Sequence, residues 1–381
     1  MQLRSRLAAG AMAVIAALAL TATSAVASDG HGNSDHDWSH SNSGKLDHIF
    51  VIMLENHSQS SVIGDVNAPF MTSLAHTYAM ADQYYGVTHP SMPNYIATIA
   101  GDNFGIQDDN DQNVVNLDRT NLVDQLEARH VSWGAYLEDL PANKLDRFGP
   151  VLPGGTVASL YAKKHNPFVL FDDVKNNPAR MANIKDYSQL ATDLNGKKAP
   201  AFVWISPNQC NDMHGGVYDT VPGHPETPCP YGSAKDDAND ASLKQKADAF
   251  VHSAVDMIMN SRAWTKHSAI VIVTDENDYA AANEATGHWE TADGCCDSPY
   301  VPAGDPRVSA DWPGGTYGGG LIPAIVVSAS GPRHFVDHTP YNHYSLLTTI
   351  EENWNLGYIG HAGDTANGVV PMWKAFTGKS K

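Results

Sequence analysis

The chain has 381 residues, 42% of them hydrophobic, and its 42 acidic residues outnumber its 24 Lys and Arg residues to give a formal net charge of -18. This composition, with 31 Gly and 22 Pro, is typical of a loop-rich α/β protein and excludes a disordered or collagen-like chain. The acidic excess repels phosphate backbones and anionic lipid headgroups, which argues against nucleic-acid binding and against stable membrane association. An anionic substrate would need a local positive feature, such as a metal ion or a helix N-terminus.

The first 44 residues have the composition of a targeting segment and a tail. Residues 1–27 begin with a short cationic segment, continue with an apolar, Ala-rich run and end in Ala-Val-Ala, which predicts a secretory signal peptide. The apolar run is short for a transmembrane anchor. Residues 28–44 are rich in Ser, Asp, Gly, Asn and His, and they predict a flexible His-rich tail. We therefore expect a secreted, extracellular protein whose residues 45–381 form a single catalytic domain.

Four cysteines fit an exported protein, because disulfides form outside the cytosol. Cys210 and Cys229 flank a Gly- and Pro-rich loop, and Cys295 and Cys296 are adjacent, so three pairings are open. A bond between the adjacent cysteines would be strained, and the other pairings would cross-link the two loops. The absence of Cys-x-x-Cys spacing disfavours a structural zinc site.

After residue 44 the sequence alternates short apolar runs with helix-like segments. The apolar runs, rich in β-branched residues, predict buried parallel strands at His48–Leu54, Ala201–Ser206, Ala269–Thr274 and Ile322–Ser328. The segments between them predict helices at Asn94–Ala100, Asn121–His130, Asp186–Leu194, Ala238–Asn260 and His343–Trp354. This alternation predicts an α/β fold with a central, mostly parallel sheet flanked by helices on both faces.

Polar side chains follow three of the predicted strands. They are Glu55 and Asn56 after the first strand, Asp212 and His214 shortly after the second, and Asp275 and Glu276 after the third. Ligand sites of open α/β sheets lie beyond the carboxyl ends of the strands, so we expect the three clusters to meet at one edge. Oxygen and imidazole ligands in such numbers favour a metal site over three unrelated turns.

The segment from Thr88 to Tyr95 supplies a candidate nucleophile. Pro90 prevents a helix before Ser91, while Pro93 suits the first turn of a helix. Ser91 is therefore expected at a helix N-terminus, where backbone N–H groups favour an anion such as a phosphate. The alternative that Ser91 is only a helix cap stays open on this segment alone. Thr88 is a second candidate, less favoured because it precedes Pro90.

Taken in order, these segments resemble the motif set of the phosphoesterase family that groups bacterial phospholipases C with secreted acid phosphatases. The resemblance is carried by Val51–Ser58 (VIMLENHS), the Pro-Ser-x-Pro-Asn-Tyr segment, Asn211–His214, Thr274–Glu276, and a closing strand and helix that include Ile322–Ser328, Asn342–Leu347 and Ile350-Glu351. It covers residues 46–356 and implies an alkaline-phosphatase-like fold.

The resemblance also implies roles for individual residues. Related phosphodiesterases carry a Thr that attacks phosphorus, and the corresponding residue here is Ser91. The positions that hold a metal ion in the acid phosphatases match Glu55, Asn56, Asp275 and Glu276. Oxygen-rich ligands admit Ca, Mg, Mn or Zn as the divalent ion. The His-rich ligand pattern of two-zinc phosphatases is absent from these motifs.

The remaining candidates complete a scheme for phosphoryl transfer. The Asn94 side chain and nearby backbone N–H groups would hold a nonbridging oxygen. His214, with Asp212 as its orienting partner, is the candidate that protonates the leaving oxygen and later activates water. His343 would donate to the phosphate or, equally well, cap its helix, and His89 is ambiguous in the same way.

The leading hypothesis is a secreted, metal-dependent phosphatase of the acid-phosphatase type, acting on small soluble phosphomonoesters through a phosphoserine at Ser91. The alternative enzyme is a phospholipase C that cleaves phosphodiester headgroups, but the chain has no basic face or evident amphipathic anchor. A binding protein that keeps the fold without the chemistry would leave the combination of Ser91 and two acidic clusters unexplained. The sequence makes no prediction of the oligomeric state.

Overall fold

The computed structural model describes residues 45–232, 238–278, 282–283, 288–289, 293–301, 315–316 and 318–379. The predicted signal peptide and His-rich tail lie outside the described residues. Gly44–Lys381 form one compact unit. Among the described helices, none has both the length and the apolar character that a membrane span requires.

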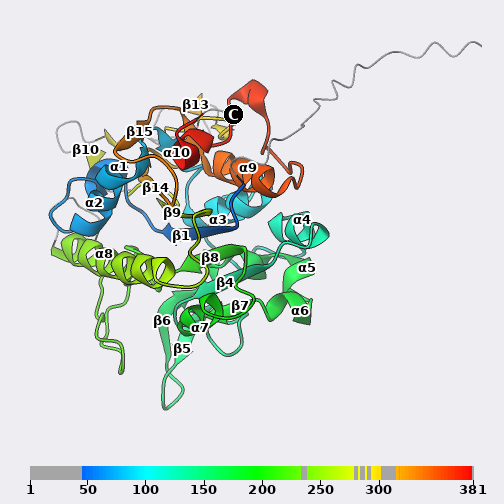
Figure 1. Ribbon diagram of the computed structural model, residues 1–381. Helices are drawn as coiled ribbons and strands as arrows, with labels where there is room; N and C mark the ends of the chain where they lie inside the picture. The colour runs from blue at the N-terminus through cyan, green and yellow to red at the C-terminus, as the bar shows by residue number, and fades with distance from the viewer. Residues whose placement is uncertain are drawn as a thin grey trace, which may run out of the picture. The chain divides into compact units, whose positions relative to one another are not determined.

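An eight-stranded sheet forms the centre of this unit (Figure 1). Its strands lie in the order β15 (Phe335–Asp337), β2 (Ala79–Ala81), β14 (Ala324–Ser328), β9 (Ser268–Thr274), β1 (His48–Leu54), β8 (Phe202–Ser206), β4 (Trp133–Leu137) and β7 (Ile184–Asp186). Most of the pairings are parallel, which confirms the predicted sheet.

The direction of β14 corrects one prediction. The run Ile322–Ser328 predicts a parallel strand, but β14 pairs antiparallel with both β9 and β2. The sheet is covered on both faces here, so a buried antiparallel strand has the same continuous apolar sequence as a parallel one. The apolar run therefore encodes burial without encoding direction.

The helices lie mostly where the sequence predicts them. They are α1 (Gln59–Val62), α2 (Pro69–Thr77), α3 (Ser91–Ala100), α4 (Leu122–Ala128), α5 (Asp172–Lys175), α6 (Pro178–Met181), α7 (Leu190–Leu194), α8 (Ala238–Met259), α9 (His343–Trp354) and α10 (Trp373–Thr377). Short 3-10 turns are η1 (Lys163–His165), η2 (Pro167–Leu170), η3 (Tyr187–Gln189) and η4 (Thr365–Asn367). The helix predicted at Asp186–Leu194 is divided into η3 and α7.

The helices cover the sheet on both faces. Ile49, Val51 and Met53 of β1 pack into a core with side chains of α3, α4, α9 and α10. The intervening residues of β1 pack into a second core with α2, α7 and α8. Successive side chains of a strand point to opposite faces, so one buried strand supplies both cores. Figure 1 shows α2 beside α8, and α3 beside α9.

Four small two-stranded ladders lie outside the central sheet. They are β5 (Phe148–Val151) with β6 (Val157–Ala162), β3 (Tyr84–Tyr85) with β16 (Tyr341–Asn342), β10 (Ala282–Asn283) with β11 (His288–Trp289), and β12 (Tyr300–Val301) with β13 (Gly315–Thr316). The ladder of β3 and β16 is parallel and brings the segment before α3 next to the start of α9.

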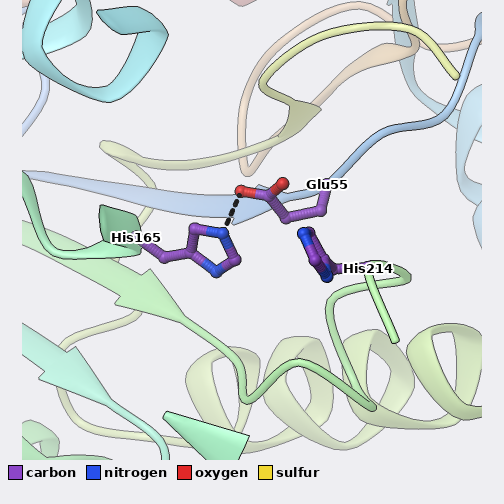
Figure 2. A group of neighbouring side chains, drawn as sticks. All are labelled: Glu55, His165 and His214. Carbon is purple, nitrogen blue, oxygen red and sulfur yellow. Dashed lines mark ion pairs between the residues drawn. The ribbon is translucent and has the colours of Figure 1, made fainter. Parts of the chain in front are cut away.

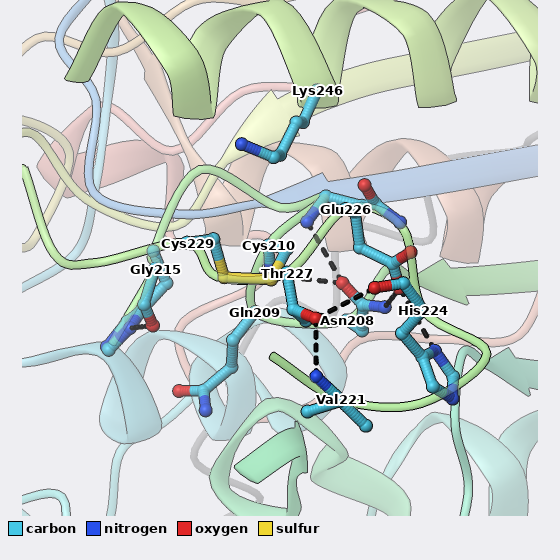
Figure 3. Close-up of a disulfide and its surroundings, with 12 residues drawn as sticks. Asn208, Gln209, Cys210, Gly215, Val221, His224, Glu226, Thr227, Cys229 and Lys246 are labelled. Atoms are coloured by element: carbon cyan, nitrogen blue, oxygen red, sulfur yellow. Dashed lines mark hydrogen bonds and ion pairs between the residues drawn. A yellow bond between two sulfur atoms is a disulfide. The ribbon is translucent and has the colours of Figure 1, made fainter. Parts of the chain in front are cut away.

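Two disulfides join the cysteines. Cys210 bonds to Cys229, and Cys295 bonds to its neighbour Cys296. Of the three pairings that the sequence leaves open, the structure has the one in which the adjacent cysteines bond to each other. The two loops are therefore not cross-linked by these cysteines. Figure 3 shows that the Cys210–Cys229 bond closes the base of a loop.

Candidate active site

The carboxyl ends of three central strands meet at one point of the sheet. Glu55 follows β1, and its backbone N–H donates to the backbone oxygen of Asp212, 2.7 Å away. Asn56 N–H donates to Asp275 Oδ1, at 3.0 Å, just after β9. Asn56 has a φ of 48°, in the left-handed region that Asn tolerates better than most residues. The three polar clusters predicted from the sequence are thus neighbours in space.

Ser91 is the first residue of α3 and points into this group of carboxylates. Its Oγ donates to Glu55 Oε2 at 3.0 Å and lies 3.3 Å from Glu276 Oε1. The residue is only 1% exposed. Helix α3 ends at Gly101, whose φ of 68° is a left-handed C-cap conformation. The helix therefore places a buried hydroxyl at its N-terminus and in direct contact with two acidic side chains.

The side chain of Asn94 bonds to the backbone of the loop before Ser91. Its Oδ1 accepts from the backbone N–H groups of Val87 and Thr88, at 2.9 and 3.0 Å. Its Nδ2 donates to the carbonyl oxygens of Thr88 and Pro90, at 2.6 and 3.2 Å. Its Nδ2 also lies 3.5 Å from Glu276 Oε2, so the Asn94 amide holds the loop before Ser91 and reaches a carboxylate of the site.

His165 lies between two of the acidic residues and is absent from the sequence-based candidates. Its Nε2 is 3.1 Å from Glu55 Oε1 (Figure 2). Its Nδ1 is 3.2 Å from Asp212 Oδ2. Burial and the charge of Lys164 lower the pKa of His165 well below its usual value. A neutral imidazole donates through only one nitrogen, so the other pairing requires a proton on the carboxyl group.

The expected pair of Asp212 and His214 is corrected in one respect. Asp212 Oδ1 accepts from the backbone N–H of His214, at 2.7 Å, and its other oxygen faces His165. The His214 ring instead meets the Gly215 carbonyl through Nδ1, at 2.9 Å, and Lys164 Nζ through Nε2, at 3.3 Å. Burial and Lys164 lower the pKa of His214 to about 3. Asp212 thus fixes the backbone of His214, and His165 is its imidazole partner.

Both ring nitrogens of His343 are hydrogen-bonded within the fold. It follows the N-cap Asn342 of α9, and its Nε2 donates to the backbone oxygen of Asp275 at 2.6 Å. Its Nδ1 accepts from the Tyr84 hydroxyl at 3.1 Å. Burial lowers its pKa to about 4. Both ring nitrogens are used within the fold, so His343 positions the backbone of a predicted metal ligand.

Two further basic side chains, His89 and Lys164, pair with carboxylates close to the start of α3. His89 Nδ1 lies 2.6 Å from Glu276 Oε2. Lys164 Nζ lies 2.7 Å from Asp109 Oδ2, and Asp109 Oδ1 accepts from the backbone N–H of Met92 in the first turn of α3. Burial opposes the charge of Lys164, but the carboxylates of Asp109 and Glu55 raise its pKa above the usual value. The site therefore holds a permanent cation that the sequence analysis did not single out.

The acidic residues fit a divalent cation. Burial raises the pKa of Glu55, Asp275 and Glu276 well above the usual range, and repulsion from neighbouring carboxylates adds to the rise. Within the described residues, the buried atoms Asn56 Oδ1 and Asp275 Oδ2 have no hydrogen-bond partner. Glu55, His165 and His214 also offer ligand atoms within 4.8 Å of one another. Buried oxygen ligands that lack donors are the surroundings that a hard cation requires.

A pair of glycines holds the segment before Ser91 close to the rest of the site. Gly319 N–H donates to the Gly86 carbonyl, and Gly86 N–H donates to the Gly320 carbonyl. A Cβ on Gly319 would lie 2.8 Å from the Gly86 Cα and 2.7 Å from the Thr88 oxygen. The glycine-rich loop thus permits a backbone approach that any side chain would block.

Comparison with known proteins identifies the family of this chain. The sequence pattern described as the Phosphoesterase family matches residues 65–224 and 230–357, which is more than half of the chain. The chain belongs to the phosphoesterase family. The family match begins after Glu55 and Asn56, so those two residues lie outside it.

Several proteins with assigned names are similar to this phosphoesterase. A probable acid phosphatase of Kluyveromyces lactis is 27% identical, over 83% of this chain and 60% of its own length. An acid phosphatase of Aspergillus fumigatus is 26% identical, over 84% of this chain and 57% of its own length. A phosphatidylinositol-3-phosphatase of Mycobacterium tuberculosis is 29% identical, over 86% of this chain and 82% of its own length. The chain spans less than two thirds of the two fungal proteins.

The fold has a counterpart among solved structures. A protein of glycosaminoglycan metabolism from Bacteroides thetaiotaomicron superposes with a TM-score of 0.53 at 11% identity, over 88% of this chain and 82% of its own. This phosphoesterase has the predicted alkaline-phosphatase-like architecture, a mostly parallel sheet between two layers of helices.

Proposed function

We propose that this protein is a secreted, metal-dependent phosphatase that hydrolyses phosphomonoesters through a phosphoserine on Ser91. The observation that carries the proposal is the position of Ser91 Oγ, at the N-terminus of α3 and within 3.3 Å of both Glu55 and Glu276. A serine that served only as a helix cap would direct its oxygen to a backbone N–H of the helix. The names of the acid phosphatases that resemble this chain support the same reaction class.

The reaction begins with the Ser91 hydroxyl. Its proton passes to one of the carboxylate oxygens beside it while Oγ attacks phosphorus, and the bond to the ester oxygen breaks. His165, whose ring nitrogens lie 3.1 Å from Glu55 Oε1 and 3.2 Å from Asp212 Oδ2, is the candidate that returns a proton to the departing oxygen. Water then attacks phosphorus, the bond to Oγ breaks, and the serine regains its proton as phosphate leaves.

The cationic groups of the site would offset the negative charge of the phosphoryl group. A divalent cation held by Glu55, Asn56, Asp275 and Glu276 would offset the negative charge of the phosphoryl oxygens. Lys164 contributes a fixed positive charge beside His214. At the start of α3, the Met92 N–H donates to Asp109 Oδ1 and Pro93 has no N–H, so the Ser91 N–H is the one that would favour an anion there. A local positive field can thus exist in a chain whose net charge is -18.

The nucleophile is tested by replacing Ser91 with alanine. The Ser91→Ala variant is expected to lose at least about a thousandfold in kcat on p-nitrophenyl phosphate, with its fold intact, because a covalent route is removed. Rapid quenching of the wild-type reaction should give a phosphorylated peptide that contains Ser91. The matched control is Ser330→Ala, an exposed serine whose hydroxyl donates to the Lys266 carbonyl. Turnover retained by Ser91→Ala would remove this residue from the mechanism.

The metal is tested by prolonged chelation. Activity should fall by more than tenfold and return when a single divalent ion is restored, and elemental analysis of the purified protein should identify that ion. Asn56→Leu, which removes an unpartnered buried oxygen, should weaken rebinding of the ion in calorimetry. An enzyme that is indifferent to chelation, with no bound ion, would contradict the assignment.

A phosphoinositide monoester is a second candidate substrate. The mycobacterial relative named phosphatidylinositol-3-phosphatase matches most of both chains, and it supports a lipid headgroup that carries a phosphomonoester. A phospholipase C reaction remains the alternative for diesters. Measuring phosphate released from phosphatidylinositol 3-phosphate and phosphocholine released from phosphatidylcholine separates these reactions, and a preference for the diester would overturn the proposed phosphatase.

Secretion is a separate part of the proposal. The two disulfides suit an oxidising compartment, and the first 27 residues have the pattern of a signal peptide. The mature protein should therefore appear in the culture medium with Ser28 as its first residue. N-terminal sequencing tests this, and an intact N-terminus on protein retained inside cells would contradict it.

A further inference from the structure

A pocket beside the catalytic centre has no part in the chemistry described so far. Its volume is about 230 Å³, and His214 and Lys164 form one side of it. The same two side chains contact each other and lie close to Glu55. The pocket therefore adjoins the place where the phosphoryl group would react, and it offers space for the remainder of a substrate.

The lining of this pocket carries a surplus of positive charge. Lys164 is paired with Asp109 at 2.7 Å. Asp111, only 3% exposed, pairs with Arg147 Nε at 2.7 Å and with Lys163 Nζ at 3.1 Å. Two carboxylates thus face three cations. In a chain with a net charge of -18, a pocket with this balance is suited to an anionic group.

Arg147 is the member of this group with unused donors. Its Nε is held by Asp111, and its guanidinium lies over the Phe148 ring, 5.2 Å from the ring centre. The side chain is 46% exposed, and within the described residues no acceptor meets its two terminal nitrogens. A planar guanidinium that is fixed by one carboxylate and one aromatic ring presents two parallel N–H groups. This arrangement suits a phosphate or carboxylate.

We propose that this pocket is the leaving-group site, and that Arg147 selects phosphomonoesters whose leaving group carries a second anionic group. The inference rests on the proposed phosphatase function. With the scissile phosphate at Ser91, the leaving group extends past Lys164 and His214 toward Arg147. The second anion, a phosphate or a carboxylate, then binds the terminal nitrogens of Arg147, while Arg147 Nε remains paired with Asp111.

The test compares fructose 1,6-bisphosphate with fructose 6-phosphate. We expect the wild-type enzyme to have the higher kcat/KM on the bisphosphate. Arg147→Gln should lower that value by about tenfold, mainly through KM, and should change the value for the monophosphate by less than about twofold, because only the second anion loses a charged hydrogen bond. Arg147→Lys keeps the positive charge but loses the two parallel N–H groups. Its kcat/KM on the bisphosphate should therefore lie between the values of the wild type and of Arg147→Gln. Arg129→Gln, at an exposed arginine outside the pocket lining, is the control.

The outcomes separate this inference from the function on which it rests. If the wild-type enzyme hydrolyses both sugars and Arg147→Gln leaves their ratio unchanged, the leaving-group site is wrong and the phosphatase stands. If Arg147→Gln lowers both values equally, the residue has only a structural role and the inference is again wrong. If the wild-type enzyme hydrolyses neither sugar nor p-nitrophenyl phosphate, the phosphatase and the leaving-group site fail together.

Discussion

At the scale of single residues, the site depends on side chains that hold backbone atoms in place. His343 is the clearest example, because it connects the Tyr84 hydroxyl to the carbonyl oxygen of Asp275. We expect His343→Phe, which keeps a ring but removes both hydrogen bonds, to weaken metal affinity by about 10- to 100-fold. It should also destabilise the fold by about 1 to 3 kcal/mol, since it leaves a buried carbonyl unpaired. Calorimetry with the restored ion and chemical unfolding measure the two effects.

Tyr84→Phe provides the matched control, because it removes one of these hydrogen bonds and leaves the contact with Asp275. Its effect on metal affinity should be no more than about threefold, given that the ring of His343 keeps its donor. If His343→Phe instead abolished turnover while metal affinity and stability were unchanged, His343 would act on the phosphate directly. That result would restore the role that the sequence suggests for it.

Most of the residues that the sequence predicted lie at the end of a strand or the start of a helix. Glu55 and Asp275 follow apolar runs directly, and Ser91 follows a proline, so their positions can be derived from local pattern. His165 and Lys164 sit in the run Lys-Lys-His after β6, where no strand of the central sheet ends. Only the tertiary structure places them beside Glu55, and no local signal could have found them.

At the scale of secondary-structure elements, the loop closed by Cys210 and Cys229 positions His214. The disulfide spans 19 residues, and both cysteines pack in a small core with Val217 and Leu243. Replacing both cysteines with alanine should destabilise the protein by about 3 kcal/mol, because the unfolded loop gains freedom. Activity should also fall, since His214 lies inside the loop. The measurements are urea unfolding and kcat/KM on p-nitrophenyl phosphate.

The second disulfide offers the control for the first. Cys295 and Cys296 are adjacent, so their bond encloses no loop, and the corresponding double alanine variant should lose less than about 1 kcal/mol by the same argument. Equal losses from the two double variants would mean that loop closure is not the source of the stability. Unchanged activity after loss of Cys210 and Cys229 would show that the surrounding packing alone holds His214.

The contact between α9 and α4 predicts a pH dependence of stability. Glu351 Oε1 accepts from Gln125 Nε2 at 2.8 Å and from the Ile359 backbone N–H at 3.0 Å. Burial raises the pKa of Glu351 to about 8, compared with about 4.3 in an unfolded chain. The folded protein therefore binds the extra proton between these two values, and its stability declines as pH rises through them, by at most about 1.4 kcal/mol per pH unit from this group.

The Glu351→Gln variant isolates this contribution. Glutamine keeps an acceptor for Gln125 and Ile359 but does not ionise, so the variant should lose less stability than the wild type between pH 5 and pH 8. Urea unfolding of both proteins across this range measures the difference. If the free energy of unfolding declined equally with pH in both proteins, the Glu351 carboxyl group would be ionised in the folded protein over this whole pH range.

The elements that sequence patterns missed have physical reasons in common. β2, β7 and β15 have three residues each, which is too short for a periodic pattern to emerge. β4 contains Gly134 and two aromatic residues, so it does not form the β-branched run by which the other central strands are recognised. The long central strands were predicted because burial on both faces of the sheet gives them a continuous apolar sequence. The amphipathic helices were predicted because one buried face gives them a periodic apolar pattern.

At the scale of the whole molecule, the net charge of -18 bears on the choice between soluble and membrane-bound substrates. Lys164 and Arg147 act over short distances inside a pocket, whereas the acidic surface acts over a Debye length, about 30 Å at 0.01 M salt and about 8 Å at 0.15 M. An anionic vesicle meets the surface before it meets the pocket. A dissolved molecule that carries the same headgroup reaches the pocket at a smaller electrostatic penalty.

We therefore expect short-chain, water-soluble phosphatidylinositol 3-phosphate to be hydrolysed about tenfold faster than the same headgroup in anionic vesicles at 0.01 M salt, with the gap narrowing at 0.15 M. Phosphate release at matched accessible headgroup concentration measures both rates. Vesicles of zwitterionic lipid with a trace of the substrate are the control, and their rate should lie close to that of the soluble lipid. A faster rate on anionic vesicles at low salt would mean that a basic or apolar face binds membranes, and it would favour the membrane-bound substrate over the soluble phosphomonoester.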